Sequence, residues 1–327
     1  MLEIPFRVSQ AFFIFIMILL LSDERDLSTT QVIEWLDILD KKWIRINQED
    51  KIEIEFCGNE IVFKLNTIEF KFSDIRSFWY RRGFLNLKTD STGIDPFDEF
   101  QNMELNILMQ YVYYKFNKIH HLSSIKNANV NKLIVTSMAR DCNIETPDDY
   151  IFSNRINLET VSSNYKNAFI TKSMSGDSIR EFENFIVFNY TTEVKPDWKI
   201  PESFSPSLIQ NHIAKKYELR IFYLAGDFYT MAIFSQNDNQ TSVDFRNYND
   251  TKPNRRVPFK LPLAIEQKLD TLMKNLDLNS GSIDMIVTPD DNYVFLEVNP
   301  VGQFGMTSFP CNYNIEKKIA EYLSYEN

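Results

Sequence analysis

The sequence predicts a protein of mixed class, with an α/β segment first and α+β segments after it. Its 327 residues are enough for two or three domains. In the first third, apolar runs of strand length alternate with segments of helical period, whereas short strands dominate after residue 207. Apolar residues make up 44% and charged residues 24% of the chain, the balance of an ordinary globular protein.

The amino-terminal segment allows two interpretations. Residues 11–21 form an apolar run after Arg7, like the central region of a signal peptide. The run is short for a membrane span, and no small-residue cleavage site follows it. Residues 16–21 also suit a buried parallel strand that opens an α/β domain. We favour the strand, and we expect residues 1–16 to be an extension that precedes a start at Met17.

Residues 17–125 are expected to form the α/β domain. After the first strand, apolar residues recur with a helical period over 29–39, with Ser28 or Thr29 as the cap. The further elements of this domain are expected to be a strand at 44–46, a hairpin of 52–56 and 61–65, a strand at 75–80 and a helix at 97–116.

Residues 126–206 are expected to form a small middle domain, and residues 207–327 a larger α+β domain. Three prolines between residues 196 and 206 are typical of a linker. The middle domain is expected to contain a helix at 132–143 and strands at 169–172 and 185–190. The last domain is expected to contain strands at 208–210, 217–224, 227–234, 282–288 and 293–298, and helices at 263–276 and 315–323.

Three oxygen-bearing side chains converge in the predicted terminal hairpin. Glu297 and Asn299 are two residues apart in one strand, so their side chains leave the same face. The turn at residues 290–292 brings Asp284 of the preceding strand opposite that face. Such a set suits Mg2+, which takes few protein ligands and completes its octahedron with phosphate oxygens and water. A solvated polar strand face is the alternative, but two of the eight glycines follow at once, which favours a site.

This hairpin resembles the metal-binding segment of ATP-grasp enzymes. Its second strand runs into the sequence FLEVNP, and the sequence SID lies in its first strand. The resemblance implies that Asp284, Glu297 and Asn299 hold the Mg2+ ions that bridge the phosphates of ATP.

Cationic residues upstream extend this resemblance. Lys132 opens a helix and resembles the first nucleotide-binding lysine, and Lys172 in the strand FITK resembles the second. By itself Lys132 would be an ordinary solvated helix residue, whereas an unpaired lysine in an apolar strand is costly, which supports a role for Lys172. The resemblance assigns Arg220 and Arg246 to phosphate or the acyl phosphate, where arginine offers a two-point contact.

Residues 210–213 resemble the hinge that grips adenine in the same family. The resemblance implies nucleotide contacts from Gln210, Asn211 and Ile213, and from Glu218 shortly after them; Asn211 stands where the family often has Glu. The implied architecture is the ATP-grasp fold, with an N-terminal pre-ATP-grasp domain, a small central lid domain and a C-terminal α+β domain. The nucleotide would lie between the last two.

The sequence WYRR at residues 79–82 points to one branch of the family. An aromatic pair beside Arg81 and Arg82 suits a carboxylate clamp, and a strand end with solvated charges is the alternative. The run resembles a segment of the maturases of graspetides, the microviridin-type peptides, and the grasp-with-spasm group is the closest likeness. The likeness extends from residue 17 to the end, and it implies that Arg81 and Arg82 bind the substrate.

The implied activity is that of a ligase which consumes ATP with Mg2+. It would activate Asp or Glu side chains of a ribosomally made precursor peptide as acyl phosphates and form ester or amide crosslinks within that peptide, after recognising its leader. Two other ligases fit the same site: one that adds amino acids to a protein tail, like the ribosomal-protein glutamate ligases, and one that joins two metabolites. A non-catalytic nucleotide-binding module is a third alternative, against which the intact metal set argues.

Charge and cysteine content narrow the partners. The net charge is −10 and the pI is near 5.0, which argues against a nucleic acid. Cys57, Cys142 and Cys311 lie far apart, without disulfide or zinc spacing, so we expect a cytoplasmic protein without a membrane partner. The three histidines form no catalytic set, and no Ser or Cys nucleophile pattern occurs. A homodimer is compatible with this interpretation.

Overall fold

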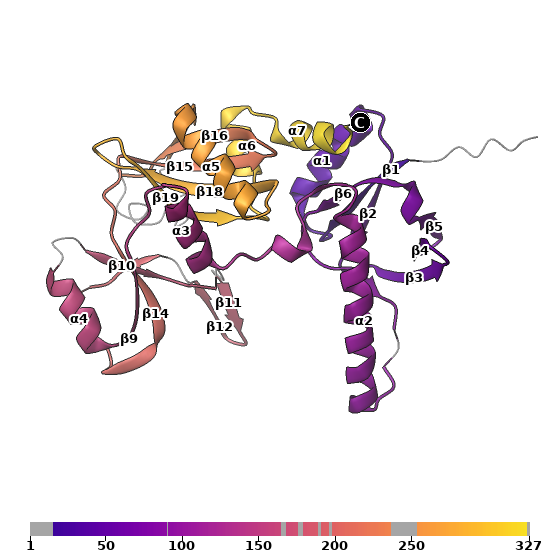
Figure 1. Ribbon diagram of the computed structural model, residues 1–327, viewed down its shortest axis with the longest axis horizontal. Helices are drawn as coiled ribbons and strands as arrows, with labels where there is room; N and C mark the ends of the chain where they lie inside the picture. The colour runs from indigo at the N-terminus through magenta and orange to yellow at the C-terminus, as the bar shows by residue number, and fades with distance from the viewer. Residues whose placement is uncertain are drawn as a thin grey trace, which may run out of the picture. The chain divides into compact units, whose positions relative to one another are not determined.

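The computed structural model describes residues 16–89, 91–164, 168–175, 179–188, 191–195, 198–236 and 254–325 (Figure 1). By its internal contacts the chain divides into two compact units, one of Met1–Ser124 with Lys317–Asn327 and one of Ile125–Glu316. The three-domain division drawn from the sequence stays a prediction. Within the described ranges, no helix has the length and apolar character needed to cross a membrane.

A parallel sheet forms the centre of the first unit. Its strands, in spatial order, are β2 (Trp43–Asn47), β1 (Met17–Ser22), β6 (Ile75–Tyr80) and β8 (His120–Leu122). Leu19, Leu20 and Leu21 in β1 are fully buried, because a parallel sheet covered on both faces needs apolar residues along the whole strand. The strand interpretation of residues 16–21 is therefore confirmed.

Helix α1 (Leu27–Ile38) follows β1 and is capped by Asp26. The Asp26 carboxylate accepts a hydrogen bond from the backbone N–H of Thr29 at 2.8 Å. The expectation of Ser28 or Thr29 as the cap is wrong, because Asp26 stands one residue before the first helical turn and reaches its third amide. Val32 and Leu36 on the inner face of α1 are fully buried.

The first unit also holds a second sheet, packed largely by aromatic rings. Its strands, in spatial order, are β5 (Ile68–Lys71), β4 (Glu60–Leu65), β3 (Lys51–Cys57) and β7 (Asn86–Leu87), and a 3-10 turn, η1 (Phe72–Asp74), follows β5. Helix α2 (Asp95–Phe116) ends at Phe116, whose ring centroid lies 5.8 Å from that of Phe63 and 4.3 Å from that of Phe78. Its last turns are anchored in this way, and its earlier turns extend away from the sheets of this unit (Figure 1).

An antiparallel sheet forms one part of the second unit. Its strands, in spatial order, are β13 (Thr192–Glu193), β10 (Phe169–Lys172), β14 (Ser203–Asn211) and β9 (Asp149–Asn154). Helix α4 (Arg155–Asn164) packs Leu158 against Phe169 and Ile209 of the sheet. The predicted linker at 196–206 is partly wrong, because β14 begins at Ser203. The ladder shifts register between Ser203 and Ser207, which accommodates a proline that has no N–H to donate.

A larger antiparallel sheet forms the rest of this unit. Its strands, in spatial order, are β17 (Arg255–Phe259), β16 (Asp227–Phe234), β15 (Tyr217–Leu224), β18 (Ser280–Val287) and β19 (Tyr293–Asn299). Helices α3 (Lys132–Asp141) and α5 (Leu263–Asn275) share a core with it, in which Val135 and Leu272 lie with Leu219, Ile283 and Phe295. The remaining elements of the second unit are a hairpin of β11 (Ile179–Phe182) and β12 (Phe185–Phe188), the 3-10 turn η2 (Ile125–Asn127) and helix α6 (Gly305–Cys311). Most of helix α7 (Ile315–Leu323) belongs to the first unit, which resumes at Lys317.

Candidate nucleotide and metal site

The two strands of the predicted metal site pair as the sequence indicates. Asp284 of β18 stands directly opposite Glu297 of β19, and Ser282 stands opposite Asn299. Residues that face each other across an antiparallel pair place their side chains on the same face of the sheet. The carboxylates of Asp284 and Glu297 therefore lie side by side, which is the arrangement that the hairpin predicts.

A β-bulge in β19 adds a feature that alternation does not predict. The register shifts between Asp284 and Met285, so that one extra residue of β19 is accommodated there. As a result Leu296 and Glu297, although consecutive, both line the pocket on this face, whereas Phe295 and Val298 on either side lie in the core. Bulges re-aim side chains in this way and are common beside functional sites.

The chain turns sharply after β19 and returns against β18. The backbone N–H of Gly302 donates to the carbonyl oxygen of Asn299 at 3.0 Å. A Cβ atom at Gly302 would lie 2.3 Å from Cβ of Ser282, so only glycine fits this position. Asn299 shares the face of Glu297, but its side chain is exposed and lies outside the set that lines the pocket.

Two cation–carboxylate pairs flank the strands. The Lys132 ammonium lies 2.9 Å from Oε2 of Glu297, and Nη1 of Arg220 lies 2.6 Å from Oδ2 of Asp284. Lys132 is the first residue of α3, whose cap Asn131 accepts hydrogen bonds from two amides of the first turn. Arg220 occupies the position of β15 opposite Asp284, so strand register alone brings the second pair together.

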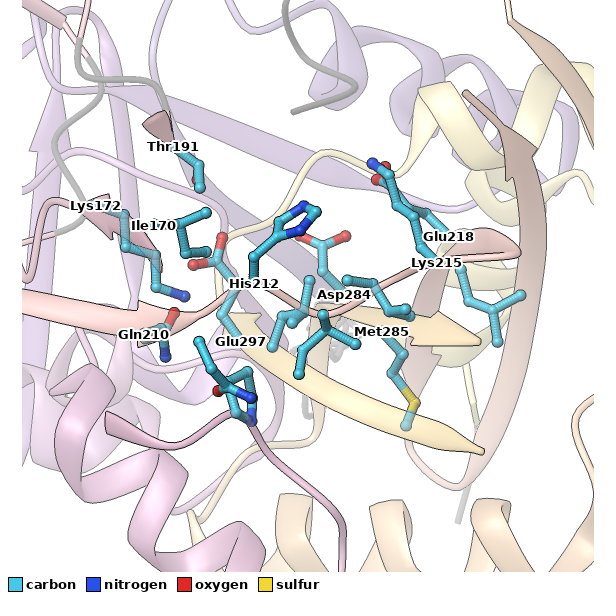
Figure 2. A pocket seen from close by; sticks show the side chains of 16 residues that line it. Ile170, Lys172, Thr191, Gln210, His212, Lys215, Glu218, Asp284, Met285 and Glu297 are labelled. Carbon is cyan, nitrogen blue, oxygen red and sulfur yellow. The ribbon is translucent and has the colours of Figure 1, made fainter. Parts of the chain in front are cut away.

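These pairs border a pocket that joins the two sheets of the second unit. Figure 2 shows the Lys172 ammonium and the carboxylates of Asp284 and Glu297 at the same cavity. Its apolar wall consists of Pro147, Ile170, Ile213, Leu219, Met285, Ile286 and Leu296. Its polar wall consists of Lys172, Thr191, Gln210, Asn211, His212, Lys215, Glu218, Asp284 and Glu297.

The predicted hinge lies at the end of β14 and is held from the neighbouring strand. The Gln210 side-chain amide donates to Oδ1 of Asp149 at 2.5 Å, and Oδ1 of Asn211 accepts from the backbone N–H of Asp148 at 2.7 Å. Arg140 in turn holds Asp149, with 2.9 Å between Nη2 and Oδ2. The structure therefore brings Gln210, Asn211 and Ile213 to the pocket wall, with the amide of Gln210 oriented by a carboxylate.

Three polar residues of the pocket were missed from the sequence: Thr191, His212 and Lys215. Lys215 is buried and forms an ion pair with Glu218, whose carboxylate also accepts from the Ser235 hydroxyl at 3.0 Å. Burial raises the pKa of Glu218, and the lysine beside it opposes that rise. Burial likewise lowers the pKa of His212, so the neutral imidazole is favoured at the pocket wall. The sequence signal that could have identified Lys215 is its position three residues before Glu218, which the structure buries.

The remaining predicted residues lie apart from this group. In the first unit Arg81 and Arg82 both contact Oδ2 of Asp26, with Nε at 3.2 Å and 2.7 Å. Arg81 is buried, which lowers its pKa to about 10 although Asp26 opposes the shift. The Arg82 side chain is 40% exposed. Arg246 lies outside the described residues, and the roles of all three arginines stay predictions.

The donor set of the strand pair fits Mg2+. Mg2+ prefers hard oxygen ligands and usually binds one or two protein carboxylates together with phosphate oxygens and water. Asp284 and Glu297 supply two carboxylates from opposite positions of the ladder. Within the described ranges, no three Asp, Glu, His or Cys side chains gather as a metal cluster. The site therefore suits an ion that takes two carboxylates from the protein and its other ligands from phosphate and water.

No sequence family and no curated protein matches the chain. The macrocyclase MdnC from Microcystis aeruginosa MRC, solved with the precursor peptide MdnA, is 25% identical, with a TM-score of 0.76 over 94% of this chain and 99% of that chain. A RiPP-associated ATP-grasp ligase from Chryseobacterium gregarium, solved with ADP and with a leader and core peptide, is 22% identical, with a TM-score of 0.77 over 94% and 95%.

A more distant similarity is to D-alanyl-alanine synthetase A from Vibrio cholerae, which is 10% identical with a TM-score of 0.55 over 95% of this chain and 98% of that chain. Together these similarities confirm the predicted ATP-grasp fold and the resemblance to maturases of ribosomally made peptides. The chain has the ATP-grasp fold, and it is similar over almost its whole length to solved macrocyclases and ligases that act with precursor peptides.

Proposed function

We propose that this protein uses ATP and Mg2+ to crosslink side chains within a ribosomally made precursor peptide. The observation that carries the proposal is the pocket in which Lys172, Asp284 and Glu297 meet the hinge, within a fold shared almost end to end with a peptide macrocyclase. Its apolar wall suits the faces of a purine, and its polar wall suits the ribose and phosphates. Gln210, Asn211, Ile213 and Glu218 are the proposed contacts to the nucleoside.

The phosphates are assigned to the cationic side of the site. A nucleoside triphosphate carries about four negative charges, which must be neutralised before a carboxylate can approach. Lys132, Lys172 and Arg220 supply positive charge there, and Arg246 is proposed to join them. Lys132 and Arg220 already pair with the carboxylates of Glu297 and Asp284. On nucleotide binding, the cations can turn to phosphate and the carboxylates to Mg2+, so that the net charge of the site stays nearly balanced.

Asp284, Glu297 and Asn299 are the proposed ligands of Mg2+. When bound, the nucleotide and its metal supply the phosphoryl group that turns a substrate carboxylate into a better acyl donor. The residues of this chain orient the phosphates, neutralise their charge and exclude water, so their contribution is electrostatic and positional.

The substrate is proposed to be a precursor peptide with a leader segment, bearing Asp or Glu carboxylates and Thr, Ser or Lys acceptors. An activated carboxylate is lost to water unless an acceptor is already near, and an acceptor on the same peptide has a high effective concentration. A protein of net charge −10 needs cationic anchors for an acidic peptide. Arg81 and Arg82 are the proposed anchors, with Arg82 the more accessible of the two.

Mass spectrometry of a candidate precursor, after incubation with the enzyme, ATP and Mg2+, tests this proposal. Loss of one water per ring within a single peptide chain is the expected result, and the Glu297→Gln variant serves as the control for ATP-dependent chemistry. Mild alkali opens ester rings and leaves amide rings intact, which separates the two products. A gain of mass from free amino acids on a protein tail would refute the proposal in favour of a tail ligase.

A further inference from the structure

The side-chain amide of Gln210 is held in one orientation at the wall of the pocket. Gln210 lies in β14 directly opposite Asp149 of β9, and its Nε2 donates to Oδ1 of that carboxylate at 2.5 Å. The other carboxylate oxygen of Asp149 lies 2.9 Å from Nη2 of Arg140, in the last turn of α3. A carboxylate that pairs with an arginine can only accept hydrogen bonds. The amide of Gln210 therefore turns its NH2 group to Asp149 and its oxygen away.

The oxygen of this amide is a buried acceptor beside the pocket. Gln210 is only 3% exposed, and its Oε1 has no hydrogen-bond partner in the part of the chain that the structure describes. Figure 2 shows Gln210 at the cavity with Ile170, which stands opposite it in β10. Because a buried acceptor without a partner costs free energy, a ligand that donates to Oε1 is favoured over one that does not.

Arg140, Asp149 and Gln210 form a hydrogen-bonded relay that keeps the amide from reversing. Arg140 is itself fixed, since its Nε donates to the Thr146 hydroxyl and its Nη2 to the carbonyl oxygen of Pro147, both at 2.7 Å. Half a turn of the Gln210 amide would set its oxygen against Oδ1 of Asp149, and two acceptors at that distance repel each other. The relay therefore presents an acceptor, and not a donor, on the pocket side.

A fixed acceptor distinguishes purines by the group at position 6. Adenine carries an amino group there, which donates, whereas hypoxanthine and guanine carry an oxygen, which accepts. Pro147 and Ile170 line the pocket with Gln210 and suit the flat faces of a purine. We propose that Arg140 and Asp149 position the Gln210 oxygen to accept a hydrogen bond from the 6-amino group of adenine, and that the relay makes the site selective for ATP over 6-oxopurine nucleotides. The inference rests on the proposed function, since it requires a nucleoside triphosphate in this pocket.

Titration calorimetry of the full chain, with Mg2+ and either ATP or ITP, tests the selectivity. ITP has an oxygen in place of the 6-amino group and lacks the 2-amino group of GTP, so the size of the base is almost unchanged. Wild-type protein should bind ITP about tenfold to a hundredfold more weakly than ATP, because Oε1 of Gln210 then faces another acceptor. Equal binding would refute this inference alone, whereas failure of both nucleotides to bind would refute the proposed function as well.

Asp149→Asn tests the relay, because it should reverse the amide of Gln210. Arg140 only donates, so it takes the oxygen of the new side chain, whose NH2 group then faces Gln210. The oxygen of Gln210 turns to that donor, and its own NH2 group turns to the pocket. The ratio of the ITP Kd to the ATP Kd should therefore fall at least tenfold. Asp141→Asn is the matched control, since Asp141 is exposed at the end of α3 and does not line the pocket, and it should keep the wild-type ratio.

A wild-type ratio in Asp149→Asn would overturn the relay. Gln210→Met decides the matter if a thermal melt shows that Asp149→Asn does not fold. Methionine is close to glutamine in length but offers no strong acceptor, so the ratio of the ITP Kd to the ATP Kd should fall about tenfold, mainly through weaker binding of ATP. An unchanged ratio in Gln210→Met would show that other groups distinguish the base, and it would overturn the proposal.

Discussion

Replacing Glu297 with glutamine separates the role of its charge in catalysis from its role in folding. The Glu297 and Lys132 side chains are 18% and 21% exposed, so their ion pair is partly solvated, and its loss should lower the free energy of unfolding by only about 1 kcal/mol. Glutamine has nearly the same shape and can still accept from Lys132. The loss of a metal-binding charge should instead reduce turnover about a hundredfold to a thousandfold, equivalent to about 3–4 kcal/mol in the barrier.

The assay is the rate of ADP release over a range of Mg2+ concentrations, together with a thermal melt of each variant. Glu266→Gln is the matched control, because Glu266 also pairs with a lysine, at 2.5 Å, and its side chain is 13% exposed, but it lies on α5 away from the pocket lining. Both variants should melt within a few degrees of the wild type. Turnover of Glu297→Gln near that of Glu266→Gln at limiting Mg2+ would refute the metal assignment.

Three further predictions follow from single side chains. Lys172→Met should lower ATP affinity or turnover about a hundredfold, and titration calorimetry with ADP release should reveal which; no change in either would contradict the phosphate role. Leu36→Ala should remove about 2–5 kcal/mol from the free energy of unfolding in chemical denaturation, whereas the exposed Glu34→Ala should change it little. Burial lowers the pKa of His212 below its unfolded value near 6.5, so this side chain contributes stability above about pH 6.5 that is lost as pH falls through the folded pKa. Melts of wild type and His212→Asn should therefore diverge above about pH 6.5 and converge at lower pH; parallel curves would show that the shift is absent.

The two strands of the site were predictable because polar and apolar residues alternate there and the polar ones are of the types that bind Mg2+. Polar Glu297 and Asn299 alternate with buried Val298, and this pattern is sufficient to place two ligands on one face. The short turn fixes the register only as far as Met285 opposite Phe295, and the bulge then sets Asp284 opposite Glu297 instead of Leu296. The bulge was not predictable, because Phe295, Leu296 and Val298 are all apolar and the sequence does not reveal which of them leaves the core.

The elements in the middle of the chain were harder to predict, because tertiary packing rather than a local sequence pattern decides which of their residues are buried. Strand β9 (Asp149–Asn154) and helix α4 (Arg155–Asn164) have mixed composition, and their burial is decided by packing on Phe169 and Ile209 rather than by a local pattern. Lys215 and His212 reach the pocket because β14 ends beside the larger sheet, a tertiary relation that local spacing does not contain. Pro206 favoured a linker in the sequence, but strand β14 continues past this proline because its pairing with β9 shifts register there.

The bulge in β19 gives the site a position at which it can evolve. Residue 296 faces the pocket without contributing to the core, which Phe295 and Val298 fill, and without supplying the charge of Glu297. A single codon change at 296 can therefore widen or narrow the apolar wall while the metal-binding carboxylate stays in place. Deleting residue 296 would restore strict alternation between Phe295 and Val298 and leave the glutamate on the pocket face, but it would remove the side chain through which the apolar wall can change.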